Sequence, residues 1–142
     1  MAERVLLVDD EEAFLEVTSE RLRARGMEVA TSSSAPEALA MIEQDLFDAV
    51  VLDLKMPGMD GLEALKRIRE RRPDVQVILL TGHGTLEKAV EAIKRGAMDF
   101  IEKPADLDAI ANKIRKAKQK RVLITDEMNK ENILEMLRRF GV

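Results

Sequence analysis

The sequence predicts an α/β fold in which an open, doubly wound, five-stranded parallel sheet is covered by helices on both faces. Five short runs rich in Val, Ile and Leu recur, at residues 4–8, 27–31, 48–52, 75–80 and 99–102. They read as continuous apolar runs, which is typical of parallel strands that are buried on both faces. Stretches with helical spacing lie between them, so the expected order is a strand followed by a helix, five times.

The segments between the runs carry the start and stop signals of helices. Five helices are expected, over residues 12–26, 34–44, 61–73, 86–96 and from about residue 106. The second helix has a serine cap and Pro36 in its first turn, and the third stops before Pro73. Gly26 and Gly96 are plausible stops for the first and fourth helices.

The length of 142 residues corresponds to about one domain, which can bury a real core without covalent staples. The sequence contains no cysteine, which excludes disulfides and thiolate metal sites. The apolar run near the N-terminus is too short for a secretory signal, and no segment approaches the roughly 20 apolar residues of a membrane span. A cytoplasmic protein without membrane contact is therefore expected.

Charge is unevenly distributed along the chain. Residues 1–112 hold 14 Lys/Arg and 23 Asp/Glu, whereas residues 113–142 hold 9 and 4, and the net charge is −4. The basic run at residues 113–121 is interpreted as the solvated end of a helix, where cations are favourable. Direct binding to nucleic acid is not expected from this balance.

Chemically active side chains follow four of the five predicted strands. Asp9 and Asp10 follow the first, Asp53 the third, Thr81 the fourth and Lys103 the fifth. In open α/β sheets the ligand crevice lies at the carboxyl ends of the strands. Three carboxylates, a hydroxyl and an ammonium are thus expected to converge on one rim.

The three carboxylates predict a bound cation. Two like charges about 4 Å apart repel by about 4 kcal/mol at an effective dielectric constant near 20. Lys103 offsets only one of them, and an all-oxygen anionic site suits Mg²⁺ together with a phosphoryl group. Asp53 stands alone at its strand end and is the better candidate nucleophile, whereas Asp9 and Asp10 form a pair suited to holding a metal. Glu11 and Glu12 are interpreted as ordinary acids at a helix start.

Four segments carry a resemblance to a known family. "LLVDDEE", "VVLDLKMPGMDG", "LLTGHG" and "DFIEKP" resemble the four signatures of response-regulator receiver domains, in order and at the usual spacing, over residues 4 to about 120. The resemblance implies the CheY-like, flavodoxin-like strand order 2-1-3-4-5.

The resemblance also implies roles for individual residues at the phosphorylation site. Asp53 would be the phosphoacceptor, supplied by a sensor histidine kinase, a phosphotransfer protein or a small phosphodonor. Asp10, Asp53 and the Lys55 carbonyl would bind Mg²⁺ directly, and Asp9 would bind it through a water. Lys103 would pair with the phosphoryl oxygens.

The resemblance further implies a conformational switch. Thr81 would move toward the phosphoryl group and Phe100 would rotate into the vacated space, which changes the surface of the fourth helix, fifth strand and fifth helix for a downstream partner. The switch position is Phe where the family commonly has Tyr. The peptide bond between Lys103 and Pro104 would be cis.

Three residues are expected to tune how fast Asp53 loses its phosphoryl group. Lys55 and His83 each lie two residues after a site residue, and Gly82 leaves the site open. A phosphohistidine relay through His83 is a rival reading that the residues favour less.

The chain divides by sequence into a receiver domain at 1–120 and a C-terminal helical extension at 121–142. Thr125 is a good N-cap for a separate sixth helix, in which Ile133, Met136, Leu137 and Phe140 form an apolar stripe. Such a stripe has to be buried, by folding back on the receiver, by forming a homodimer or by leading into an effector domain.

The leading hypothesis is a phosphorylation-dependent signalling switch acting as a stand-alone receiver, with assisted self-phosphorylation and self-dephosphorylation but no other enzymatic activity. Residues 81–104 resemble most closely the receivers of nitrogen-regulator-type activators, so one alternative is the receiver portion of such an activator without its output domain. A second alternative is a Mg²⁺-dependent aspartyl phosphatase. That reading is weakened because Lys55 stands where such phosphatases need a second Asp.

Overall fold

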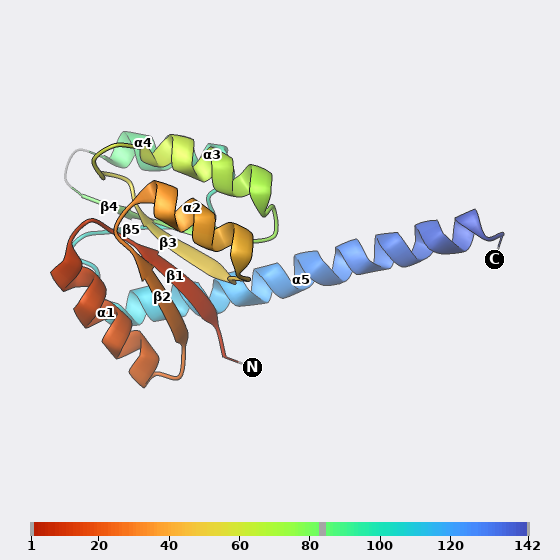
Figure 1. The fold of residues 1–142 in the computed structure, drawn as a ribbon, viewed down its shortest axis with the longest axis horizontal. Coiled ribbons are helices and arrows are strands. Elements are labelled where there is room, and N and C mark those ends of the chain that lie inside the picture. Colours follow the sequence, from red (N-terminus) through yellow and green to blue (C-terminus); the bar gives the residue numbers. More distant parts are fainter. Residues whose placement is uncertain (1, 83–84, 142) are drawn as a thin grey trace.

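The computed structural model describes residues 2–82 and 85–141 and contains a five-stranded parallel sheet (Figure 1). The strands are β1 (Arg4–Val8), β2 (Glu28–Ser32), β3 (Ala49–Asp53), β4 (Gln76–Thr81) and β5 (Asp99–Glu102). Their order in the sheet is β2-β1-β3-β4-β5, which confirms the predicted order and fold class. Each neighbouring pair is parallel.

Helices cover both faces of the sheet, as the continuous apolar runs predict. They are α1 (Glu12–Ala24), α2 (Ala35–Gln44), α3 (Gly61–Arg71), α4 (Leu86–Lys94) and α5 (Leu107–Arg139). Helices α2, α3 and α4 lie on one face, and α1 and the first half of α5 lie on the other (Figure 1). Successive strand residues point to opposite faces. Leu6 and Val8 of β1 therefore pack on the α2–α4 side, while Val5 and Leu7 pack against α1 and α5.

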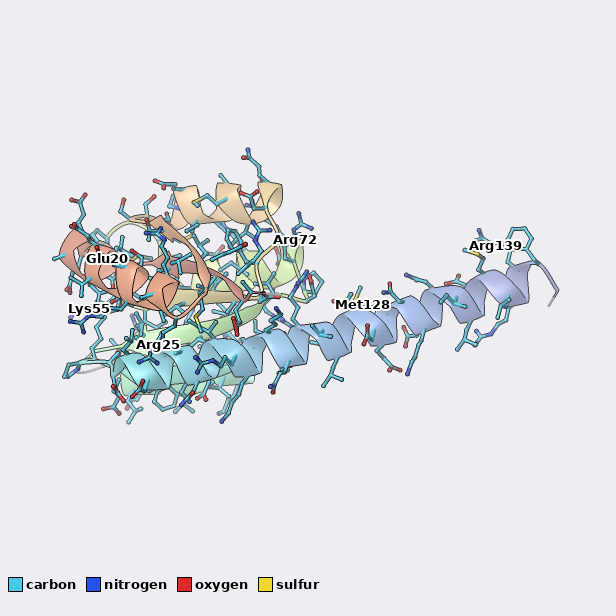
Figure 2. All side chains as sticks on the ribbon, turned by 90° about the horizontal axis from the view of Figure 1, so that it is seen from below. Glu20, Arg25, Lys55, Arg72, Met128 and Arg139 are labelled. Atoms are coloured by element: carbon cyan, nitrogen blue, oxygen red, sulfur yellow. The ribbon has the colours of Figure 1, made fainter. Side chains whose placement is uncertain are left out.

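The C-terminal extension is helical but does not form a separate sixth helix. Helix α5 runs without interruption through Thr125, so the prediction that Thr125 caps a new helix is wrong. Residues 107–139 contain neither Gly nor Pro, and restarting a helix would carry the cost of a second nucleus. Residues 126–141 are exposed along their whole length and project away from the body of the domain (Figures 1 and 2).

Arg121 holds α5 at the point where the helix leaves the domain. Its guanidinium lies 3.0 Å from Asp48 Oδ1 and 2.9 Å from Asp74 Oδ2. Asp48 also accepts a 2.8 Å hydrogen bond from the Arg4 backbone N–H. Asp48 and Asp74 precede β3 and β4, so this network ties α5 to the amino ends of the strands, away from the predicted site.

A second ion pair joins α5 to β5. Lys113 pairs with Asp99, whose carboxylate also accepts a 2.8 Å hydrogen bond from the Phe100 N–H. Burial alone would raise the pKa of Asp99, but the hydrogen bonds from Lys113 and Phe100 and the charges of Lys113 and Lys116 leave it below its ordinary value of 3.8. The ionised carboxylate therefore stabilises the fold.

Helix α5 is 33 residues long and carries many charged side chains. Within residues 2–82 and 85–141, the structure contains no helix with the length and apolar character that a membrane crossing requires.

We predict that Arg121→Ala lowers the free energy of unfolding by about 1–3 kcal/mol, because it removes the guanidinium that forms ion pairs with Asp48 and Asp74. Urea denaturation of both chains measures the difference. Arg115→Ala is the matched control, since Arg115 lies on the same helix, is exposed and donates a hydrogen bond to Asn112, three residues earlier. Equal losses in the two variants would contradict the role of Arg121.

We also predict a pH-dependent effect of Asp99→Asn. Because the folded-state pKa of Asp99 is lowered, its contribution is fully present above the unfolded pKa near 3.8 and is lost as the pH falls through the folded value. The side chain is 40% exposed, so the substitution is expected to cost only about 0.5–1 kcal/mol at pH 7. Denaturation at pH 7 and at pH 3 checks this, and a cost that persists unchanged at pH 3 would refute it.

Candidate functional site

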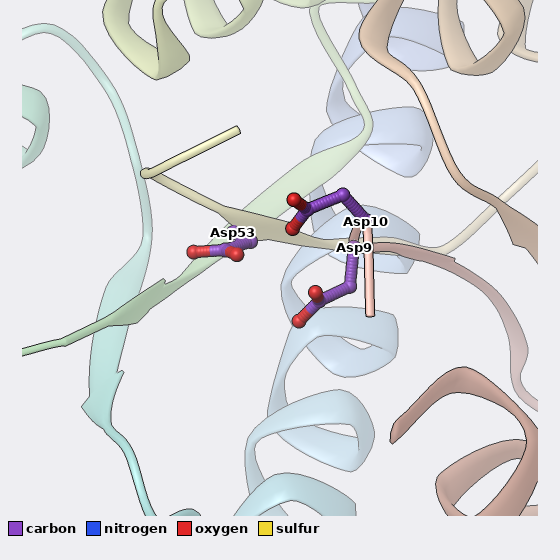
Figure 3. Close-up of side chains that lie close together, drawn as sticks. All are labelled: Asp9, Asp10 and Asp53. Carbon is purple, nitrogen blue, oxygen red and sulfur yellow. The ribbon is translucent and has the colours of Figure 1, made fainter. Parts of the chain in front are cut away.

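Three carboxylates meet at the carboxyl ends of β1 and β3. Asp9, Asp10 and Asp53 each offer an oxygen, and these oxygens all lie within 4.8 Å of one another (Figure 3). The cluster follows from the register of the sheet, because Val8 of β1 pairs with Leu52 of β3, so Asp9 and Asp53 come next on two parallel neighbours. Asp9 is fully buried and Asp53 is only 5% exposed, whereas Asp10 is exposed.

An ammonium group reaches this cluster from the end of β5. Lys103 Nζ lies 2.7 Å from Asp9 Oδ2, 3.5 Å from Asp53 Oδ2 and 3.8 Å from Glu11 Oε1. The Lys103 backbone N–H donates a 2.7 Å hydrogen bond to the Thr81 carbonyl, which fixes the start of the side chain beside β4. The following peptide bond, between Lys103 and Pro104, is cis.

Backbone groups hold the two buried carboxylates in place. The Glu11 N–H donates a 2.9 Å hydrogen bond to Asp9 Oδ1, and the Lys55 N–H donates a 3.1 Å hydrogen bond to Asp53 Oδ1. Asp9 thus has one oxygen on the backbone and the other on Lys103. Asp53 keeps its second oxygen at the longer distance of 3.5 Å from Lys103.

The charges in the site do not balance. Burial raises the pKa of the Asp53 carboxyl above its ordinary value of 3.8, and the charge of Asp9 adds to this, while the Lys55 N–H and Lys103 act in the opposite direction. Burial would lower the pKa of Lys103, but the hydrogen bond to Asp9 and the surrounding carboxylates outweigh it and raise the pKa. Lys103 is therefore firmly charged, and Asp53 is a carboxylate whose negative charge is under-compensated.

The site opens into a cleft of about 530 Å³. The cleft is lined by Asp10, Glu11, Asp53, Lys55, Met56, Pro57, Gly82 and Lys103. Asp9 does not line it, so Asp10 and Asp53 can reach a bound group directly while Asp9 lies behind them. A Cβ added to Gly82 would meet nothing within 4 Å, so this position leaves the mouth of the cleft open.

Thr81 and Phe100 lie beside the cluster on neighbouring strands. Thr81 is the last residue of β4 and is 1% exposed, and its hydroxyl donates a 3.4 Å hydrogen bond to the Ile101 carbonyl. Phe100 of β5 is half-buried and packs against the core on the α2–α4 side. The predicted tuning residue His83 lies outside the described residues.

Phe14 is a neighbour of the site that the sequence did not single out. Its ring centre lies 4.9 Å from Lys103 Nζ, so the ammonium is placed over an aromatic face as well as among carboxylates. In the sequence Phe14 reads only as part of the apolar face of α1. Phe14 and Lys103 are 89 positions apart, so no local sequence pattern around Phe14 indicates their contact.

Comparisons with known proteins agree with this geometry. Residues 5–115 match the family model described as response regulator receiver domain. The chain is 40% identical over 125 residues to the C4-dicarboxylate transport transcriptional regulatory protein DctD of Rhizobium meliloti (strain 1021), covering 88% of this chain and 27% of that protein. It spans about a quarter of the length of the curated relatives it matches.

Two solved structures extend the likeness to three dimensions. A response regulator receiver domain protein from Clostridium thermocellum superposes with a TM-score of 0.83 at 34% identity, covering 86% of this chain and 98% of that one. The beryllofluoride-activated NtrC4 receiver domain dimer gives a TM-score of 0.78 at 39% identity, covering 83% and 98%. The predicted resemblance to receivers of nitrogen-regulator-type activators is confirmed, and the chain belongs to the response regulator receiver domain family.

Proposed function

We propose that this receiver is a phosphorylation-activated switch that accepts a phosphoryl group on Asp53. The observation that carries the proposal is the placement of Asp53, a buried carboxylate with a raised pKa that faces an open cleft beside the Lys103 ammonium. An under-compensated carboxylate with one oxygen held by the Lys55 N–H has its other oxygen available to attack phosphorus.

The transfer we propose exchanges one bond for another. A carboxylate oxygen of Asp53 bonds to phosphorus as the bond from phosphorus to the donor breaks, and the donor leaves with its electron pair. For a phosphohistidine donor the leaving group is the imidazole, which takes up a proton. Lys103 supplies a fixed positive charge to the phosphoryl oxygens, and Thr81 supplies a hydroxyl at the end of the neighbouring strand.

The donor set fits Mg²⁺. Asp10 and Asp53 line the cleft, and the Lys55 carbonyl lies in the loop after β3. These three would hold the ion directly, and Asp9, which does not line the cleft, would act through a water. These oxygen ligands with one or two direct carboxylates suit Mg²⁺, which keeps several waters. When bound, Mg²⁺ supplies positive charge that Lys103 alone cannot provide, to Asp53 and to the phosphoryl oxygens.

The output surface we propose is formed by α4, β5 and α5. Leu86, Val90 and Ile93 follow one face of α4 and are 51%, 48% and 38% exposed, which makes an apolar strip available to a protein partner. Movement of Thr81 toward the phosphoryl group frees space beside β5 for Phe100, and Phe100 packs on the same side of the sheet as α4. The readout is a change in packing, since Phe100 has no hydroxyl.

The partners we propose are a sensor histidine kinase or phosphotransfer protein upstream and a protein target of the α4–β5–α5 surface downstream, in the cytoplasm. Assisted self-phosphorylation and self-dephosphorylation are the only chemistry assigned to the chain, and Lys55, Gly82 and His83 are proposed to set their rates. DctD is named as a transcriptional regulatory protein, and its 40% identity favours as a second candidate the receiver part of such an activator.

We predict that incubation with Mg²⁺ and acetyl phosphate adds one phosphoryl group to the chain and that Asp53→Asn abolishes the addition. Intact-mass spectrometry measures the adduct. Asp45→Asn is the control, because Asp45 is an exposed carboxylate away from the cleft. An adduct that survives in Asp53→Asn, or no adduct in the unsubstituted chain, would contradict the assignment.

We further predict that Thr81→Ala separates phosphorylation from its readout. The variant is expected to take up the phosphoryl group, because Asp53 and Lys103 are intact. Amide hydrogen exchange over α4 and β5 is expected to change on phosphorylation in the unsubstituted chain and to change at least about threefold less in the variant, since the coupling hydroxyl is gone. Identical exchange responses in the two chains would argue against Thr81 as the coupling residue.

A further inference from the structure

The aromatic ring of Phe14 lies against the Lys103 ammonium. The ring centre is 4.9 Å from Lys103 Nζ, inside the distance of about 6 Å at which an aromatic face attracts a cation. Phe14 is the third residue of α1, and Lys103 follows β5 directly. Phe14 does not line the cleft, so its ring acts on a bound group only through Lys103.

Three carboxylates lie near the same ammonium, at unequal distances. Lys103 Nζ is 2.7 Å from Asp9 Oδ2, 3.5 Å from Asp53 Oδ2 and 3.8 Å from Glu11 Oε1. The Glu11 side chain is 68% exposed, whereas Asp9 and Asp53 are buried. Because lysine carries its charge on a flexible four-carbon stem, nothing in the stem itself keeps the ammonium beside the buried pair and away from Glu11.

We propose that Phe14 is a positioning residue that holds the Lys103 ammonium at Asp53 through a cation–π interaction. The inference rests on the proposed acceptance of a phosphoryl group by Asp53. An aromatic face attracts an ammonium but carries no net charge, so the ring does not neutralise Lys103. The N–H groups of the ammonium remain for Asp9 and for the phosphoryl oxygens. A further carboxylate in the place of the ring would compete with the phosphoryl group for Lys103.

Core packing holds the ring in place. Phe14 is half-buried and packs against the apolar cluster between the sheet and helices α1 and α5, which includes Leu7, Leu15 and Ile110. A side chain that positions a reactive group has to be fixed by its own surroundings, and this cluster provides that support. The Lys103 side chain is only 21% exposed, and a cation–π contact strengthens as the cation loses water.

A simpler explanation is that Phe14 only fills the core beside α1. Removing the ring would disturb the molecule on either explanation, so truncation alone does not separate them. They differ in what they require of the ring. Core filling depends on shape and apolar area, whereas a cation–π contact depends on the negative potential of the ring face. Fluorine on the ring withdraws electron density from that face and changes the shape little.

Replacement of Phe14 by mono-, di- and trifluorophenylalanine in the 142-residue chain tests the proposal. We expect the rate of phosphorylation by acetyl phosphate with Mg²⁺ to fall stepwise along the series, to about three- to tenfold below the unsubstituted chain, because each fluorine weakens the attraction to Lys103. The urea midpoint of unfolding is expected to stay constant or to rise, since the apolar area is kept. Intact-mass spectrometry follows the phosphorylated fraction with time.

Phe47 supplies the matched control. Its ring centre lies 5.9 Å from Arg4 Cζ, and it precedes β3 at the end of the sheet opposite the cleft. The same fluorinated residues at position 47 weaken a contact of the same kind at a distant place. They are therefore expected to leave the phosphorylation rate within about twofold of the unsubstituted chain.

A measurement on the unphosphorylated chain reports the contact itself. An aromatic ring shields protons that lie over its face, so the Lys103 methylene protons next to the ammonium are expected to resonate upfield of those of exposed lysines. Phe14→Leu is expected to remove this shift, and Phe14→Tyr, which keeps an aromatic face, is expected to retain it together with the phosphorylation rate. The nuclear magnetic resonance spectra need neither Mg²⁺ nor a phosphodonor.

Two results would overturn the inference and leave the proposed function standing. One is a phosphorylation rate that does not change along the fluorinated series at Phe14, or that changes equally at Phe47. The other is a Lys103 resonance that does not respond to Phe14→Leu. An unsubstituted chain that takes up no phosphoryl group would contradict the proposed function itself, and the positioning role with it.

Discussion

Three carboxylates and one ammonium share a rim because five parallel strands all end there, and this imbalance of charge governs the rest of the site. Asp9 and Asp53 are buried, so water does little to screen them, and Lys103 is bound more closely to Asp9 than to Asp53. Burial and the charge of Asp9 raise the pKa of Asp53. Because its negative charge is buried and only partly neutralised, the Asp53 carboxylate is stabilised by a cation that enters the cleft. The site is therefore suited to a divalent ion and to the phosphoryl group that such an ion accompanies.

The remaining structure connects this rim to surfaces that a partner can contact. Thr81 ends β4 beside the carboxylates, and Phe100 of the neighbouring strand β5 packs on the same side of the sheet as α4. The amino ends of β3 and β4 are tied to α5 by Arg121, which binds Asp48 and Asp74 where the helix leaves the domain. Since α5 continues unbroken to residue 139, a single helix belongs both to the domain and to the projecting C-terminal extension.

Much of the fold was predictable from local patterns, and the contacts that escaped prediction are the non-local ones. The apolar runs at residues 48–52 and 75–80 identify β3 and β4 because parallel buried strands leave no alternation. The convergence of Asp9, Asp53 and Lys103 follows from the strand ends. The cation–π contact of Phe14 and the Arg121 network join residues far apart in sequence and have no local signature. The prediction that Thr125 begins a new helix was wrong. A favourable N-cap residue stabilises a helix start by less than it costs to interrupt and renucleate a helix that contains no Gly or Pro.

The central claim, that under-compensated negative charge at Asp53 is what makes this a cation site, is tested most directly by equilibrium unfolding with and without Mg²⁺. We expect Asp53→Asn to be more stable than the unsubstituted chain in metal-free buffer, because the variant lacks the buried charge. On saturation with Mg²⁺ the order inverts, since the unsubstituted chain gains about 2.7 kcal/mol at a concentration 100 times its dissociation constant and the variant gains much less. An unsubstituted chain that is the more stable one without metal, or one whose stability does not respond to Mg²⁺, would contradict the account.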